Sequence, residues 1–225
     1  MSNKVNARWA GFFYFLLVIG GIFSLMYVPS NIIVWEDTTA TLSNLTTHNS
    51  LFRLGIVAEL LSYLVFIMVP LLIYRLLHHV HEVHAKLMVI LVLVSIPISM
   101  IAVGYKLNIL DLLDDASTFT AVDLEISVMN AFDAYYNLIL VAQLFWGLWL
   151  LPFGYLVYQS GILPKVLGFF LMLGSVGYFL DVLFRILFLD YNSWIIADYI
   201  TIPASIGELG TCLWLLIMGA KEPIE

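Results

Sequence analysis

The sequence predicts an all-α fold, an integral membrane bundle of six transmembrane helices with both termini in the cytoplasm. Hydrophobic residues make up 62% of the 225 residues and charged residues only 11%, whereas soluble domains carry about a quarter charged residues. The apolar stretches are also long enough to cross a bilayer, which takes about 20 residues. No length remains for a separate soluble domain, so we expect one membrane domain over residues 1–225.

The predicted spans follow one another with short loops. They cover about residues 8–28, 52–77, 85–107, 127–158, 164–189 and 196–219. The first has no Ala-x-Ala-like cleavage site after it, and its apolar run is too long for the hydrophobic region of a signal peptide, so we expect it to be retained. The fourth is unusually long and contains Pro152. Because proline removes a backbone donor, this span is expected to be tilted or kinked near its end.

Charged residues in the loops predict the orientation. Basic residues flank the ends of the spans that share a side with the N-terminus, namely Lys4, Arg8, Arg75, Lys86, Lys165 and Lys221. The opposite loops are acidic and carry Glu36, Asp37, Asp111, Asp114, Asp115, Asp123, Glu125, Asp190 and Asp198. The positive-inside rule therefore places both termini in the cytoplasm. Six spans keep this alternation, whereas five would break it.

Composition also limits the function. The net charge of -7 and the lack of a basic patch argue against nucleic-acid binding. The single cysteine, Cys212, excludes an intramolecular disulfide. No phosphate-binding loop or dinucleotide fingerprint is present, so no cofactor is expected. The partners we expect are the lipid bilayer and a small molecule or ion, and glycines on the first and fifth spans would permit an oligomer.

Charged and polar residues inside the spans are the main indication of function. A charge against lipid costs about 2.5–3.5 kcal/mol on insertion scales, so these groups should face the bundle interior. Most fall in the outer half of the predicted bundle, with Glu208 deeper. The candidate binding residues are Arg53, Glu59, Lys106, Asp133, Asn137, Asp181, Arg185 and Glu208.

These residues favour a protein that binds or transports a small solute or ion. Glu59, Asp133, Asn137, Asp181, Arg185 and Glu208 would line a polar pocket open to the extracytoplasmic side, with Arg53 and Lys106 at its mouth. Arg185 follows Asp181 by four residues, so the two can pair along one helix face.

Two alternatives remain open. Asp133 and Asp181 could act as the acid–base dyad of an intramembrane enzyme, although no catalytic motif surrounds them and we assign no catalytic residue. The protein could instead be a structural or regulatory membrane subunit whose buried charges only hold helices together. An enzyme is the less favoured of the three classes.

A histidine cluster falls in the predicted loop between the second and third spans. His78, His81 and His84 are weak candidates for metal ligands, since imidazoles at positions i and i+3 of a helix can share a metal. The order His-Glu-Val-His lacks the spacing of a zinc-protease helix. A hydrated interfacial loop is the favoured explanation of the cluster, and no metal is expected.

Several stretches together resemble a known family. They are Arg8-Trp9-Ala10-Gly11-Phe12-Phe13-Tyr14, Leu51-Phe52-Arg53-Leu54-Gly55-Ile56, the stretch from Gly154 to Gly168, Ile202-Pro203-Ala204-Ser205-Ile206-Gly207-Glu208-Leu209 and Leu213-Trp214-Leu215-Leu216-Ile217. In these motifs the chain resembles a bacterial multi-pass membrane family known as domain of unknown function number 4386. The chain has Gln159 where members often have arginine.

The resemblance implies a six-span protein of the bacterial cytoplasmic (inner) membrane, in agreement with the topology read from the residues. It implies no activity, so it transfers no catalytic role. Its motifs include Arg53 and Glu208.

Overall fold

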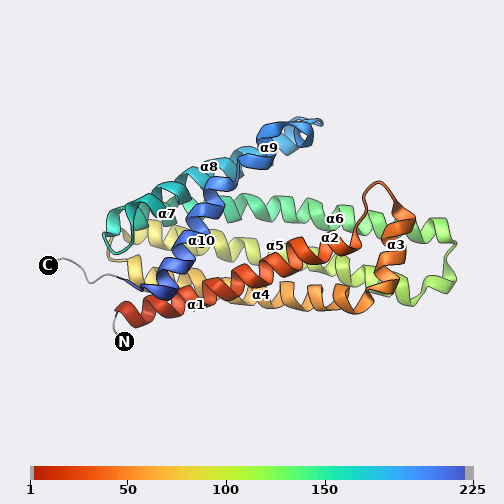
Figure 1. Ribbon diagram of the computed structural model, residues 1–225, viewed down its shortest axis with the longest axis horizontal. Helices are drawn as coiled ribbons and strands as arrows, with labels where there is room; N and C mark the ends of the chain where they lie inside the picture. The colour runs from red at the N-terminus through yellow and green to blue at the C-terminus, as the bar shows by residue number, and fades with distance from the viewer. Residues whose placement is uncertain (1–2, 221–225) are drawn as a thin grey trace. The chain divides into compact units, whose positions relative to one another are not determined.

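The computed structural model describes residues 3–220, and these residues contain helices and no strand. The elements are α1 (Asn3–Gly21), the π-helix η1 (Ile22–Tyr27), α2 (Val28–Ile32), α3 (Thr38–Thr47), α4 (Asn49–Leu77), α5 (Glu82–Asp114), the 3-10 turn η2 (Ala116–Thr118), α6 (Ala121–Leu148), α7 (Leu150–Ser160), α8 (Lys165–Leu187), the 3-10 turn η3 (Tyr191–Ser193), α9 (Ile195–Tyr199) and α10 (Ile202–Ile217) (Figure 1).

Six helical stretches are long and apolar enough to cross a membrane, which confirms the six predicted spans. They are Lys4–Ile32, Asn49–Leu77, Glu82–Asp114, Ala121–Ser160, Lys165–Leu187 and Ile195–Ile217. The orientation of the termini stays a prediction. The prediction missed α3, a helix in the first loop, whose N-terminus is capped by the Asp37 carboxylate accepting a hydrogen bond from the Ala40 amide at 2.8 Å.

Prolines affect the spans unequally. Pro152 lies one turn after the break at Trp149 that separates α6 from α7, where its missing N–H leaves the carbonyl of Leu148 without its helical partner. Pro70 and Pro97 lie inside the continuous helices α4 and α5. Of these three spans, only the fourth is therefore interrupted near its proline.

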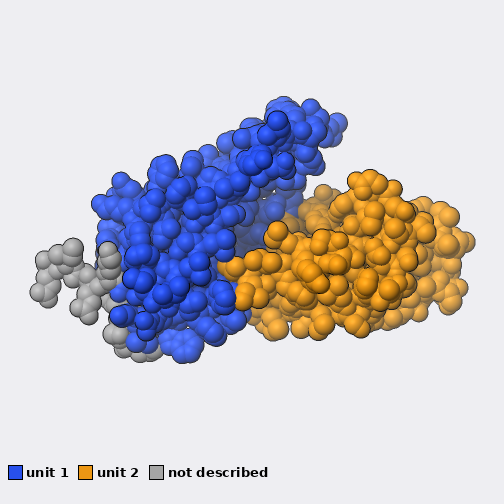
Figure 2. Space-filling view, in the orientation of Figure 1, with its two compact units in different colours: residues 1–16, 65–96, 140–225 blue, residues 17–64, 97–139 orange. Residues whose placement is uncertain are grey.

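The chain forms two compact units (Figure 2). Unit 1 contains residues 1–16, 65–96 and 140–225, and unit 2 contains residues 17–64 and 97–139. Each unit has its own buried side chains and its own polar contacts, and each is described separately below. The expectation of a single domain over residues 1–225 stays a prediction.

Unit 1 is packed around Trp149, which is 1% exposed. Its ring contacts those of Tyr14, Phe66 and Phe153, with centroids 6.2, 5.5 and 5.1 Å away. Aromatic rings at such separations stabilise a core beyond the area that they bury. Trp149 is therefore a packing residue of this unit.

Small residues allow the helices of unit 1 to approach closely. Gly154 of α7 faces Gly168 of α8, and a Cβ built on either residue would lie 2.6 Å from the other's carbonyl oxygen. Gly174 of α8 lies against the backbone of Ala204 of α10 in the same way, and Figure 1 shows α10 beside α8. Because apolar side chains gain little from leaving lipid for another helix, such close backbone approach drives packing in membranes.

Unit 2 combines the end of the first span with parts of α4, α5 and α6. Val28 of α2 packs against Gly55 of α4, in the place that a Cβ at Gly55 would occupy. The rings of Phe52 and Phe132 are in contact, with centroids 6.0 Å apart. The first span changes here from α-helix to the π-helix η1 and back. A π-helical turn is rare and is frequent at functional sites.

Candidate functional site

The strongest polar centre of the described residues lies inside unit 2, at Glu59 of α4. Glu59 is 0% exposed, and Lys106 of α5 is 3% exposed. The Lys106 ammonium donates to Oε2 of Glu59 at 2.7 Å. Oε1 of Glu59 accepts hydrogen bonds from the hydroxyls of Tyr63 at 2.8 Å and Tyr135 at 2.7 Å. We call these four residues the Glu59 centre.

Helical phase explains how the Glu59 centre assembles. Tyr63 follows Glu59 by one turn of α4, so both side chains share a face. The outer face of the same helix carries the exposed residues Leu54, Val57, Leu61, Leu64, Met68 and Leu71. An apolar outer surface with a buried ion pair is the arrangement that lipid requires, since an unpaired charge against lipid is costly.

Lys106 departs most clearly from its expected place. It was expected at the mouth of the pocket, but it is buried and paired with Glu59. Its ammonium also lies over the ring of Tyr135, 4.0 Å from the centroid, where a cation is attracted by the π-electrons. Among the described residues, its one hydrogen bond goes to Glu59, although an ammonium can donate three.

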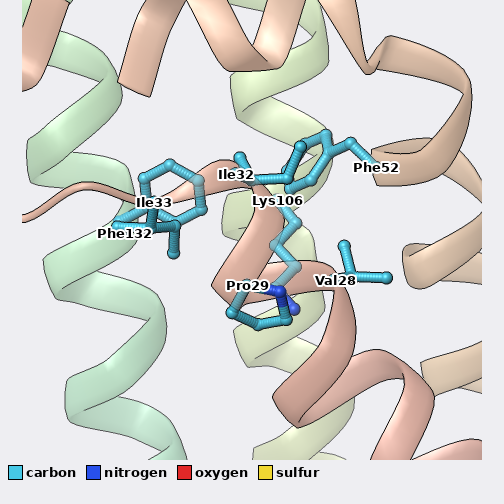
Figure 3. A pocket seen from close by; sticks show the side chains of 7 residues that line it. All are labelled: Val28, Pro29, Ile32, Ile33, Phe52, Lys106 and Phe132. Atoms are coloured by element: carbon cyan, nitrogen blue, oxygen red, sulfur yellow. The ribbon is translucent and has the colours of Figure 1, made fainter. Parts of the chain in front are cut away.

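A small cavity adjoins Lys106 (Figure 3). It is lined by Val28, Pro29, Ile32, Ile33, Phe52, Lys106 and Phe132. Its volume of about 10 Å³ is at the lower limit for one water molecule. The lining is apolar apart from Lys106, whose side chain borders the cavity.

Asp133 and Asn137 do not join the Glu59 centre. Both are exposed, whereas the sequence analysis expected them to face inward. The buried stripe of α6 runs through Val128, Ala131, Phe132, Tyr135 and Ile139, and this apolar stripe fixes the rotation of the helix. Asp133 follows Phe132 by one residue, about 100° around the helix, and Asn137 lies two residues from both Tyr135 and Ile139, about 160° around it, so both turn outward.

Arg53 lies at the exposed end of unit 2. Its Nε donates to Oδ1 of Asn49 at 2.6 Å, and its Nη2 lies 3.6 Å from Oδ1 of Asp114. The side chains of Arg53 and Asp114 are 48% and 70% exposed, and an exposed pair of this kind contributes little to stability. Arg53 is therefore accessible, as expected, but it does not contact the buried acid.

A second polar cluster lies in unit 1, at the end of α8. Arg185 donates from Nε to Oδ2 of Asp181 at 2.9 Å, which confirms the expected pairing along one helix face. Arg185 also donates from Nη1 to Oδ1 of Asn192 at 2.8 Å, and the Tyr191 hydroxyl donates to Oδ1 of Asp181 at 3.0 Å. Asp181 is 4% exposed, so these contacts satisfy both of its oxygens and tie η3 back to α8.

Replacing Tyr191 by phenylalanine tests this cluster. Burial, together with the hydrogen bond to Asp181, raises the pKa of the Tyr191 hydroxyl to about 12, so the hydroxyl remains a donor near neutral pH. Losing a hydrogen bond to a charged group is expected to cost about 1.5–3 kcal/mol of unfolding free energy at pH 7. Because the folded pKa is raised above the ordinary value of about 10, the advantage of wild type over Y191F should be constant below pH 10 and disappear between pH 10 and about 12.

Denaturation of the two proteins in the same detergent, followed across this pH range, measures that difference. An exposed tyrosine, Tyr199, offers the control Y199F, which should show no pH-dependent difference. A constant difference between wild type and Y191F up to pH 12 would contradict the assignment.

Glu208 forms a third contact, also in unit 1. Its Oε1 accepts a hydrogen bond from the hydroxyl of Tyr14 at 3.0 Å, joining α10 to α1. On the same helix, the Thr211 hydroxyl and the Trp214 indole nitrogen are buried without a hydrogen-bond partner among the described residues. Glu208 is partly buried and is held by a tyrosine, with no basic group within ion-pair distance among the residues from 3 to 220.

The eight candidate residues thus do not form one site: six of them belong to separate contacts, and Asp133 and Asn137 are exposed. Five belong to unit 2 and three to unit 1, and the ion pairs that form are Glu59 with Lys106 and Asp181 with Arg185. The tyrosines that complete each cluster, Tyr14, Tyr63, Tyr135 and Tyr191, were absent from the sequence prediction. Of these tyrosines, only Tyr63 could have been predicted from the sequence, because it follows Glu59 by one helical turn.

No group of three or more possible metal ligands occurs among the described residues. His78 stacks on Tyr74 with ring centroids 5.3 Å apart, and His81 and His84 contact each other instead. Of the three histidines expected as weak metal candidates, His81 and His84 therefore form a pair that His78 does not join.

The fold and these buried polar contacts define a multi-pass, all-α membrane protein. The chain belongs to the family described as "Domain of unknown function (DUF4386)", whose model matches residues 9–219. This confirms the resemblance seen in the sequence motifs.

The chain is also similar to a protein of the archaeon Archaeoglobus fulgidus described as "Uncharacterized protein". The two are 35% identical over 106 residues, which is 47% of this chain and 59% of the relative. No solved structure matches the chain. The archaeal relative shows that similar sequences are not restricted to bacteria, so a bacterial source stays a prediction.

Proposed function

We propose that this protein, located in the cytoplasmic membrane, binds and carries a small solute with an anionic group, or a small anion, at Lys106 in unit 2. The observation that supports this is the position of the ammonium. It is buried, it adjoins a cavity, and among the described residues it uses one hydrogen bond, to Glu59. An anionic group that reached the cavity would find a cation with unused donor capacity.

The energetic cost of the ion pair supports a role beyond packing. Replacing a buried ion pair by well-packed apolar residues is often neutral or stabilising. Ionisable residues inside a membrane span accordingly mark binding sites and pathways more often than plain packing contacts. Apolar residues could hold α4 against α5 without the desolvation cost of the Glu59 centre, which supports a further use of its charges.

The residues that line the cavity are evidence for a site that can open. Because the cavity holds about one water molecule, a larger solute needs the wall to move. Val28, Pro29, Ile32 and Ile33 form one side of it and directly follow the π-helix η1. A π-helical turn followed by a proline, which lacks a backbone donor, leaves this part of the first span with fewer regular helical hydrogen bonds. We propose that this segment is the movable wall.

One observation favours a second candidate, a purely structural centre. Glu59 accepts three hydrogen bonds, so its carboxylate is satisfied without a ligand. A purely structural contact between α4, α5 and α6 would give Glu59 the same hydrogen bonds. The two candidates differ at Lys106, because only the binding role needs its cavity-facing side.

Ligand-dependent stabilisation distinguishes the two. Purified full-length protein in detergent is heated with each member of a panel of small carboxylates, phosphates and inorganic anions. A ligand that binds only the folded state at 100 times its dissociation constant stabilises it by about 2.7 kcal/mol. We expect at least one anion to raise the melting temperature of wild type and of K86M, whose lysine forms an exposed pair with Glu82.

The variant E59L/K106M provides the decisive comparison, because it removes both charges and leaves no unpaired one. It should fold and lose the stabilisation. If no anion stabilises wild type, or if the stabilising anion acts equally on E59L/K106M, the site is not at Lys106 and the structural candidate is favoured.

Labelling gives an independent measure of the movable wall. The protein has one cysteine, Cys212, so C212A/I33C carries a single thiol at the cavity. The stabilising anion should change the rate at which a maleimide labels Cys at position 33, whereas C212A/V83C, with its thiol at an exposed site of α5, should label at an unchanged rate.

A further inference from the structure

The histidines at the start of α5 form a pair that the Glu59 centre does not involve. His81 precedes α5 and His84 lies in its first turn. Their Nδ1 atoms are 2.8 Å apart, and their rings are nearly perpendicular, at 88°. Both residues belong to unit 1, and His81 is exposed. The pair is therefore accessible to ions in solution.

A tyrosine holds the pair in place. The ring of His84 stacks on that of Tyr155 with centroids 4.4 Å apart and an interplanar angle of 25°. The ring of His81 meets the same tyrosine edge-on at 6.1 Å. The two imidazoles thus pack against one ring from α7, which keeps their Nδ1 atoms close together.

We propose that His81 and His84 form a two-nitrogen chelate for a first-row transition-metal ion. With metal–nitrogen bonds of about 2.0–2.1 Å, two nitrogens 2.8 Å apart subtend about 84–89° at the ion. This is close to the right angle between neighbouring octahedral positions. Imidazole is a good ligand for Ni²⁺, Cu²⁺ and Zn²⁺, so the chemistry of the donors agrees with their geometry.

Metal binding needs neither a gain nor a loss of protons by the two imidazole rings. In the metal-free pair, one Nδ1 carries a hydrogen and donates to the other, whose lone pair accepts it. Moving that hydrogen to Nε2 of the same ring gives the other neutral tautomer and frees the second Nδ1 lone pair. The rings must then turn until both lone pairs point to the metal, which replaces the hydrogen bond that Nδ1 of His81 accepts from the His84 backbone N–H at 3.4 Å. Water molecules complete the coordination.

The site is expected to be exchangeable. Glu82, the nearest acid in sequence, is engaged with Lys86 at 2.7 Å, and no third possible ligand joins the pair among residues 3–220. Structural metal sites close their coordination with four protein ligands. A two-ligand site would instead release its ion readily, which suits a response to the metal concentration on that side of the membrane.

Nickel titration tests the proposal. Tag-free, chelator-treated full-length protein in detergent is titrated with Ni²⁺ by calorimetry near pH 7.5. We expect one ion per chain, with binding at least ten-fold weaker in H81Q and in H84Q. The matched control H79Q removes a neighbouring imidazole outside the pair and should bind as wild type does. Y155L should weaken binding while leaving both ligands present.

Three results would overturn the proposal: no Ni²⁺ binding by wild type, equal binding by the double variant H81Q/H84Q, or an equal loss in H79Q. Because both histidines lie at a surface turn, the variants should fold. Unchanged melting temperatures without metal would show this. A selective rise in the melting temperature of wild type with Ni²⁺, absent from H81Q/H84Q, provides the second readout.

Discussion

Replacing Lys106 by methionine is expected to lower the free energy of unfolding by about 3–5 kcal/mol, because it leaves Glu59 buried without its cation. Glu59 is fully buried and Lys106 nearly so, and the ammonium and carboxylate are 2.7 Å apart. The tyrosines that also donate to Glu59 offset only part of this loss, since neither carries a positive charge. Chemical denaturation of the purified variants in one detergent measures the effect.

The matched control is K86M, which removes a lysine from an exposed pair with Glu82. That pair is more than half exposed on both sides, and such pairs contribute little to stability. The double variant E59L/K106M should recover most of the stability lost in K106M, because it leaves no uncompensated charge. If K106M and K86M were equally stable, the buried pair would not hold unit 2 as the structure indicates.

Gly168→Ala is expected to cost about 2–3 kcal/mol, the upper part of the range for overpacking a core. The added Cβ would lie 2.6 Å from the carbonyl oxygen of Gly154 and 2.7 Å from the backbone nitrogen of Tyr158. Neither atom can move without moving α7, so α7 and α8 would have to separate. The effect should appear as a lower melting temperature and a smaller folded fraction after purification.

Gly104→Ala provides the control. A Cβ at Gly104 of α5 meets nothing within 4 Å, and alanine is favoured over glycine in a helix by about 0.5–1 kcal/mol. Glycine-to-alanine substitution should therefore stabilise the protein at position 104 and destabilise it at position 168. Equal effects at both positions would contradict the close approach of α7 and α8.

Much of the fold was predictable because a bilayer restricts what a sequence can do. A chain in lipid must satisfy its backbone hydrogen bonds within each span, which leaves helices as the simplest solution. The six spans and the family followed from apolar length and from motifs such as the one that contains Arg53. The break at Trp149 followed from Pro152, although its exact position did not.

The candidate site was predictable only in part. Local spacing gave the pairing of Asp181 with Arg185, because residues four apart share a helix face. The inward orientation expected for Asp133 and Asn137 was wrong, and the apolar stripe of α6 could have shown this from sequence periodicity alone. No comparable signal connected Glu59 to Lys106, which are 47 positions apart.

The sequence by itself therefore determined the all-α class, the number of spans and the presence of costly charges within them, because hydropathy and helical length act locally. The tertiary structure decided which charges meet. It buried Lys106 against Glu59, gave each buried acid its tyrosine, and turned Asp133 outward. Those outcomes depend on how each helix rotates and which helix lies beside it, and packing between distant segments sets both.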